Sequence, residues 1–326
     1  MAFALPREPI HDQLSVTLAF LFHKLLPDWI AIGAGGESTP LRIAYSVGDL
    51  LETVAFSYFY LRTLDAIRSI VAGSKLLNPI ALSGYLVPFF MMPAGPVNVY
   101  ADHAKMDLQE VPPPSWEGVV GCADTITTGL FLKFVVAEIW RLWFIGVQPS
   151  WPTASFFDAM VIFVCVYFDF SGYSLVALGT GRLLGIPTPV NFKAPYLSGS
   201  VTEFWTRWHI SLGDFVRRDL FIPLQVSMVR RFGRRWSYAT NMVAVVTCFV
   251  FVGLWHRFTL TFAAWGLAVG VIVAFEKVVR DRWITTQLST TRTVRLILAI
   301  LGPIYVFVVI VGTLWVAIPE LMGQPR

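Results

Sequence analysis

The feature that most constrains this chain is the presence of long stretches without Asp, Glu, Lys or Arg. Three of them run from Leu76 to Ala101, from Trp236 to His256 and from Leu296 to Pro319. A helix needs about 20 mostly apolar residues to cross the roughly 30 Å hydrocarbon core of a bilayer, and each stretch is long enough to do so. The pattern therefore predicts an integral membrane protein.

Composition supports this prediction. Charged residues make up 14% of the chain and hydrophobic residues 56%, whereas an ordinary soluble domain is roughly 25% charged. So few charged side chains could not cover the surface of a water-soluble fold, which excludes a cytosolic enzyme, a disordered chain and a nucleic-acid module. The net charge of +4 is typical of basic membrane loops. The three cysteines lack metal-ligand spacing, so we expect buried small hydrophobes and no metal site.

Further apolar segments carry a few polar residues each. Together with the three stretches above and Phe258 to Phe275, they predict seven to nine membrane segments in an all-α fold. The segment from Leu76 to Ala101 contains four prolines, so it is expected to be broken or re-entrant and buried by its neighbours. The other candidates are Leu14 to Ala34, Ala44 to Val71, Gly118 to Val147 and Phe156 to Thr180.

Two loops are rich in arginine and lysine. The segment 203–235 holds seven basic and three acidic residues, and 276–295 holds five basic and two acidic residues. The positive-inside rule places both loops in the cytoplasm. The 40 residues from Trp236 to Phe275 must then cross the membrane and return as a helical hairpin, with its turn near His256. His256 is expected on the outer side, and His209, which precedes the first arginine cluster, on the inner side.

Ionisable side chains within membrane segments are functional candidates because their burial costs several kcal/mol. His256 ends a stretch without formal charge, and it fits either a proton-exchanging group or an interfacial histidine. His209 lies one helical turn after Trp205, a spacing that also suits the membrane interface. Asp169 needs a partner, so it fits a structural ion pair as well as a catalytic carboxylate. Lys133 and Arg62 raise the same question.

Several motifs resemble those of one known family. They are D-F-S-G-Y-S at 169–174, N-F-K-x-P-Y at 191–196, E-F-W-x-R-W-H-I-S-L at 203–212 and G-L-W-H at 253–256. In this order they resemble the core of the membrane-bound O-acyltransferases, in particular the bacterial branch that modifies alginate and teichoic acid. The resemblance covers about residues 50–280, and the part before it is short relative to the family. We expect one membrane domain over 1–326.

The resemblance implies a helical ring, with broken or re-entrant segments, around a transmembrane tunnel. It also implies that His256 and His209 are catalytic, with His256 as the general base. Contacts to substrate are expected from five further residues, namely Trp205, Trp208, Asn241, Trp255 and Asp169. No tightly bound cofactor is expected, because the thioester of coenzyme A or of a carrier protein enters as the acyl donor.

The resemblance further implies a multi-pass protein of the bacterial inner membrane that transfers an acyl group, acetyl or D-alanyl, to a hydroxyl of an extracytoplasmic polymer. The expected partners are the cytoplasmic donor or carrier, an extracytoplasmic acyl-transfer protein and the bilayer, but no nucleic acid. Two alternatives stay open. One is a non-catalytic acyl-relay or scaffold subunit, and the other is a transporter whose polar path uses the same intramembrane residues.

Overall fold

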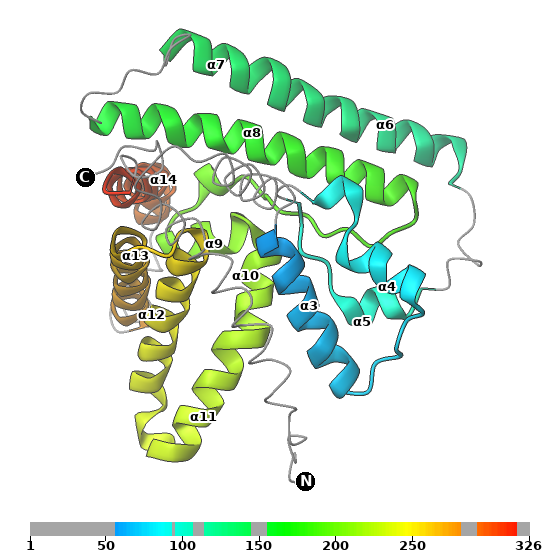
Figure 1. Ribbon diagram of the computed structural model, residues 1–326. Coiled ribbons are helices and arrows are strands. Elements are labelled where there is room, and N and C mark those ends of the chain that lie inside the picture. The colour runs from blue at the N-terminus through cyan, green and yellow to red at the C-terminus, as the bar shows by residue number, and fades with distance from the viewer. Residues whose placement is uncertain (1–55, 93–94, 107–113, 145–154, 282–291, 318–326) are drawn as a thin grey trace, which may run out of the picture. The chain divides into compact units, whose positions relative to one another are not determined.

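The computed structural model describes residues 56–92, 95–106, 114–144, 155–281 and 292–317. Within these ranges every regular element is a helix, and the only strand-like feature is an isolated bridge between Phe192 and Trp208 (Figure 1). The predicted all-α class is therefore confirmed. The predicted segment from Leu14 to Ala34, and the first part of the one from Ala44 to Val71, lie outside the described residues.

Four helical segments of the described chain are long and apolar enough to cross a membrane. The first, Trp116–Phe144, joins α6 (Trp116–Phe131), η2 (Leu132–Val136) and α7 (Ala137–Phe144). The second is α8 (Phe156–Leu183). The third, Arg234–His256, contains η5 (Arg234–Trp236) and α12 (Ser237–His256), and the fourth is α13 (Leu260–Val279). All four coincide with predicted segments. The predicted total of seven to nine stays a prediction.

The described chain divides into two compact units. Within the described residues the first unit lies in 56–129 and 173–189, and the second lies in 130–172 and 190–317. The single membrane domain that the sequence predicts stays a prediction. The first unit contains α3 (Phe56–Val71), α4 (Pro79–Leu86), η1 (Phe89–Met91) and α5 (Tyr100–Ala104), with most of α6 and the end of α8.

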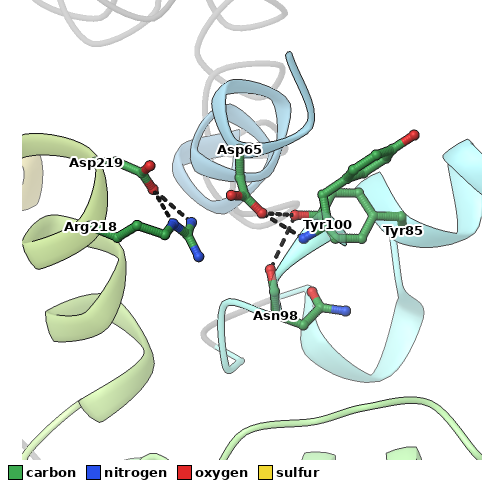
Figure 2. Close-up of polar contacts among 6 residues, drawn as sticks. All are labelled: Asp65, Tyr85, Asn98, Tyr100, Arg218 and Asp219. Atoms are coloured by element: carbon green, nitrogen blue, oxygen red, sulfur yellow. Dashed lines mark hydrogen bonds and ion pairs between the residues drawn. The ribbon is translucent and has the colours of Figure 1, made fainter. Parts of the chain in front are cut away.

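The proline-rich segment of the first unit is broken, as predicted. Its short helices α4 and α5 replace one long helix, and Tyr85 and Tyr100 are both fully buried with their rings edge to face at 5.1 Å. Figure 2 shows how a buried carboxylate ties these pieces to α3: Asp65 Oδ2 accepts from the Tyr85 hydroxyl at 2.8 Å and from the Tyr100 backbone N–H at 2.6 Å. Broken backbone at membrane depth needs such internal partners.

Arg62, one turn before Asp65 on α3, is also fully buried. Its guanidinium donates to Asn98 Oδ1 at 3.3 Å and to the Pro96 carbonyl at 3.0 Å. Both contacts hold the irregular backbone after η1, which agrees with a structural role, one of the two interpretations that the sequence left open for Arg62. Neither contact involves a residue of the candidate site described below.

The second unit contains the predicted helical hairpin. Helices α12 and α13 are joined by the three residues from Arg257 to Thr259, so the predicted turn beside His256 is confirmed. Glycines let the two backbones approach closely: a Cβ on Gly253 would lie 2.1 Å from the Phe262 carbonyl oxygen, and one on Gly266 would lie 2.3 Å from that of Phe249. Small residues commonly mediate such packing between membrane helices.

The second unit also contains η2, α7, most of α8 and six further elements. They are η3 (Pro195–Leu197), α9 (Val201–Arg207), α10 (Ile210–Val216), η4 (Arg217–Phe221), α11 (Ile222–Phe232) and α14 (Arg292–Trp315). A core of buried residues joins α8, α9, α13 and α14, including Phe163, Phe204, Phe262 and Val306. Helix α14 overlaps the predicted segment from Leu296 to Pro319. In η4, Arg218 donates to Asp219 (Figure 2).

Candidate active site

Helix α9 carries the first part of the motif 203–212, and His209 follows two residues after its end. Two caps fix the N-terminus of this helix. The Ser200 hydroxyl accepts from the Glu203 N–H at 3.1 Å. From α13, the Glu276 carboxylate accepts from the backbone N–H groups of Val201 and Thr202, both at 2.8 Å. A carboxylate at a helix N-terminus satisfies unpaired N–H groups and interacts favourably with the helix dipole. The cap therefore fixes α9 to the hairpin.

The N-F-K-x-P-Y motif holds the start of α10. Asn191 is buried, and its Oδ1 accepts from the Ser211 N–H at 3.2 Å and from the Ser211 hydroxyl at 2.6 Å. Its carbonyl accepts from the Ile210 N–H at 3.0 Å. Asn191 thus provides acceptors for the first N–H groups of a seven-residue helix, and two separate motifs meet at His209.

His209 occupies the junction between α9 and α10 in a left-handed backbone conformation with φ of +48°. For a residue other than glycine this conformation costs about 1 to 2 kcal/mol, so the surrounding structure must hold it. The side chain is only 6% exposed, and its ring meets that of Phe170 edge to face at 4.9 Å. An interfacial histidine would be exposed to headgroups, so the burial favours a role inside the protein.

Trp208 lies in an aromatic cluster beside His209. Its ring stacks on Phe163 at 5.2 Å and on Phe204 at 5.4 Å, and it meets Phe192 edge to face at 5.1 Å. Phe192 also forms the isolated bridge with Trp208. These contacts immobilise the residue before His209. Contact of Trp208 with substrate stays a prediction.

His256 is the last residue of α12 and is exposed, whereas its neighbour Trp255 is 5% exposed. The imidazole lies 4.8 Å from the Trp255 ring and 6.0 Å from the Trp265 ring of α13. Trp265 in turn lies 6.2 Å from Trp205 of α9. Aromatic contacts therefore link the G-L-W-H motif to the motif that contains His209.

The two histidines also interact electrostatically. Burial, and to a smaller extent the electrostatic influence of His256, lowers the pKa of His209 to about 3. The ring of His209 contacts Phe170 of the membrane-crossing helix α8, and its imidazole is neutral at neutral pH. A neutral imidazole donates from one ring nitrogen and accepts at the other, so His209 is suited to hold a polar group in place without carrying charge.

Asp169 is paired with Lys133. The Lys133 ammonium from η2 lies 2.5 Å from Asp169 Oδ1 on α8, and this carboxylate is 52% exposed. This agrees with the structural ion pair, one of the two interpretations that the sequence left open for both residues. The next residue, Phe170, is the one that touches His209. The motif therefore reaches the candidate site through its aromatic residue, while contact of Asp169 with substrate stays a prediction.

Asn241 lies far from His256. Both belong to α12, and the 15 residues between their positions correspond to about 22 Å along the helix axis at about 1.5 Å per residue. The structure therefore does not bring Asn241 to the hairpin turn. Asn241 lies near the arginine-rich end of the helix, and its contact with substrate stays a prediction.

Sequence reasoning missed Asn191, Trp265 and Glu276 as residues that build the site. Asn191 stood within a quoted motif, but it lies 20 positions before Ser211 at the helix start that it caps, so a local capping signal could not identify it. Trp265 and Glu276 lie in α13, outside the quoted motifs, and they reach the site only through tertiary packing. Among the described residues no group of three or more His, Cys, Asp or Glu side chains could hold a metal ion.

Comparison with known proteins agrees with the motif pattern. Residues 153–318, about half of the chain, match the membrane-bound O-acyltransferase family, and the chain belongs to this family. The matched range includes both histidines and three of the four membrane-crossing helices. The resemblance inferred from the motifs is therefore confirmed, and the chain is a multi-pass membrane protein. The ring and the tunnel stay predictions.

Curated relatives include enzymes that act on two kinds of polymer. The chain is 29% identical over 261 residues to the probable alginate O-acetylase AlgI of Pseudomonas fluorescens. This alignment covers 77% of this chain and 51% of the relative. The chain is 27% identical over 250 residues to the teichoic acid D-alanyltransferase of Streptococcus thermophilus, which covers 72% of this chain and 58% of the relative. The chain thus spans about half the length of these relatives.

A third relative matches a shorter stretch at higher identity. The peptidoglycan O-acetyltransferase of Helicobacter pylori is 37% identical over 112 residues, which is 34% of this chain and 20% of the relative. All three relatives are named for transfer of a small acyl group to a cell-envelope or extracellular polymer.

Proposed function

We propose that this chain performs acyl transfer as a membrane-bound O-acyltransferase of the bacterial inner membrane. It moves a small acyl group, acetyl or D-alanyl, from a thioester donor to a hydroxyl of an extracytoplasmic polysaccharide or polymer. The observation that carries the proposal is the series of aromatic contacts from His256 through Trp265 to Trp205, because it links the two separate motifs that contain the signature histidines. The family and the names of the relatives agree with this reaction.

His256 would act as the general base. The acceptor hydroxyl oxygen attacks the thioester carbonyl carbon while the His256 imidazole takes the hydroxyl proton. The carbon–sulfur bond then breaks, and the departing thiolate takes this proton from the imidazolium, which leaves an ester on the polymer and restores the base. The exposure of His256 at the end of α12 suits access by a polymer. A base in such a position typically contributes about 10² to 10⁴-fold to the rate.

His209 would hold the donor from the opposite side of the site. Its burial among aromatic side chains and its neutral form suit a hydrogen bond to the donor rather than an ion pair. The aromatic residues around it exclude water, which limits hydrolysis of the thioester. The donor would arrive from the cytoplasm as a thioester of coenzyme A or of a carrier protein. An extracytoplasmic acyl-transfer protein would be a further partner.

Acyl content of the polymer tests the proposed reaction. Cells that express the chain, and cells with an empty vector, would be compared for acetate and D-alanine released from purified envelope polymer by mild base. We expect the polymer content of one of these acyl groups to be higher in cells that express the chain. In isolated membranes, transfer of this group to the polymer should require the matching thioester donor. If neither acyl group rises, and proteoliposomes with the chain pass a solute instead, the transporter alternative is correct.

The sidedness of the donor leads to a second expected result. In a background without Cys122, Cys165 and Cys248, a cysteine would be placed at Ser227 in the exposed face of α11, and another at Phe258 in the hairpin turn. An impermeant thiol reagent should label Phe258→Cys in intact cells, and Ser227→Cys only after the membrane is opened, because the arginine-rich loop stays inside. The reverse pattern would overturn the assigned sides.

A further inference from the structure

The corner between α11 and α12 is an exposed basic segment of the second unit. All ten residues from 230 to 239 are exposed. Their sequence contains the same triplet twice, Arg-Arg-aromatic, once at 230–232 and once at 234–236. Gly233 separates the two triplets with φ of +89°, a conformation that only glycine adopts readily, and this turn lets η5 follow α11. We call residues 230–238 the arginine corner.

In each triplet the second arginine lies over the following ring. The Arg231 guanidinium is 5.8 Å from the Phe232 ring centroid, and that of Arg235 is 5.2 Å from the Trp236 ring. Both rings are themselves about half exposed, 55% for Phe232 and 49% for Trp236. The cation–π contacts hold two guanidinium groups at the level of exposed aromatic rings.

The charges of the arginine corner are not compensated by the described part of the protein. None of its four arginines, at positions 230, 231, 234 and 235, forms a salt bridge with a described carboxylate, whereas Arg207 and Arg218 each do. Four positive charges within six residues repel one another, so an external anion stabilises them. A guanidinium binds phosphate through two parallel N–H groups, which makes phosphate a fitting anion.

The position of the corner narrows the source of this phosphate. It marks the beginning of the membrane-crossing segment Arg234–His256. Exposed apolar side chains continue from Trp236 through Tyr238 to Val243 on α12, and such a face is suited to lipid chains. Aromatic residues beside arginines are typical of the depth of the lipid headgroups. These large exposed rings are less suited to contact with an acidic protein in water than to contact with lipid.

We propose that the arginine corner is a binding site for anionic phospholipids, in which the arginines hold the phosphodiester headgroup and the rings of Phe232 and Trp236 lie beside it. This site is separate from acyl transfer and does not depend on it. Each arginine near an anionic lipid surface strengthens binding by about fivefold. Loss of two arginines should therefore weaken binding by at least about tenfold.

Native mass spectrometry of the purified full-length chain in detergent would measure lipid binding. We expect phosphatidylglycerol to bind at least about tenfold more tightly than phosphatidylcholine, and R230Q/R231Q or R234Q/R235Q to lose this preference. The matched control K277Q/R280Q removes two charges from the other basic loop, where Lys277 already lies 4.0 Å from Asp281, and should keep the preference. Equal binding of both lipids by the wild-type chain would overturn the proposal.

A variant that retains all four arginines separates a lipid site from a site for any polyanion. Phe232→Leu with Trp236→Leu keeps the charge but removes the stacked rings, and its affinity for phosphatidylglycerol should fall several-fold while its thermal stability without lipid stays at the wild-type value. A polyglutamate peptide would compete with phosphatidylglycerol for the wild-type chain. If the peptide binds more tightly than the lipid and displaces it, the corner is a protein-docking surface instead.

Discussion

Replacement of His256 by alanine should lower acyl transfer at least about 100-fold, because it removes the base that takes the proton from the acceptor hydroxyl. His256 is exposed at the end of α12 and does not belong to the buried core. Its truncation leaves no large cavity, so expression, membrane insertion and thermal stability should stay at wild-type values. Turnover per molecule of purified protein, at saturating donor and acceptor, gives the measurement.

Arg257→Gln is the matched control for this variant. Arg257 is the exposed neighbour of His256, and its backbone N–H caps α12 by donating to the Gly253 carbonyl, so glutamine removes the adjacent charge while the cap and the imidazole are kept. We expect its turnover to stay within a few-fold of wild type. A His256→Ala protein that keeps more than about a tenth of wild-type turnover would contradict the general-base role. If the purified wild-type protein has no turnover alone, but the polymer is acylated when a partner protein is present, the scaffold alternative is correct.

The hairpin could be predicted from sequence because one physical rule fixes it. Two arginine-rich loops on the same side of a membrane require the chain between them to cross twice, and the apolar length between them is just sufficient for two helices. The structure places the turn at Arg257 to Thr259, where the prediction placed it. The break in the proline-rich segment was predictable for an equally local reason, because proline removes a helical hydrogen bond.

The candidate site was only partly predictable because its contacts are distant in sequence. The motifs identify His209 and His256, but nothing in their spacing shows that the charge of one affects the pKa of the other. Glu276 caps α9 across 75 positions, and Trp265 joins His256 to Trp205 from a helix that looks uniformly apolar in sequence. Apolar periodicity predicts that such a helix is buried, but not which residue it packs against.

Replacement of His209 should reduce use of the donor while leaving use of the acceptor unchanged. His209→Asn is the informative variant, since asparagine tolerates the left-handed backbone conformation with φ of +48° and retains a polar side chain. We expect kcat/KM for the donor to fall at least about tenfold because the shorter amide no longer reaches it, with an unchanged KM for the acceptor. His209→Gln, which nearly matches the length of histidine, should retain more activity than His209→Asn. Equal losses for both substrates would contradict a donor-side role.

The low pKa of His209 adds an independent test by stability. In the folded protein His209 stays neutral down to about pH 3, whereas in the unfolded chain it takes up a proton below about 6.5. Stability from the neutral form is therefore fully present above pH 6.5 and is lost as pH falls, by about 2 kcal/mol between pH 6.5 and 5. Asparagine has no such titration, so the difference in Tm between wild type and His209→Asn should shrink from pH 7 to pH 5. A histidine exposed to water would give the same difference at both pH values, which would remove the physical basis for a buried, neutral group at the donor side.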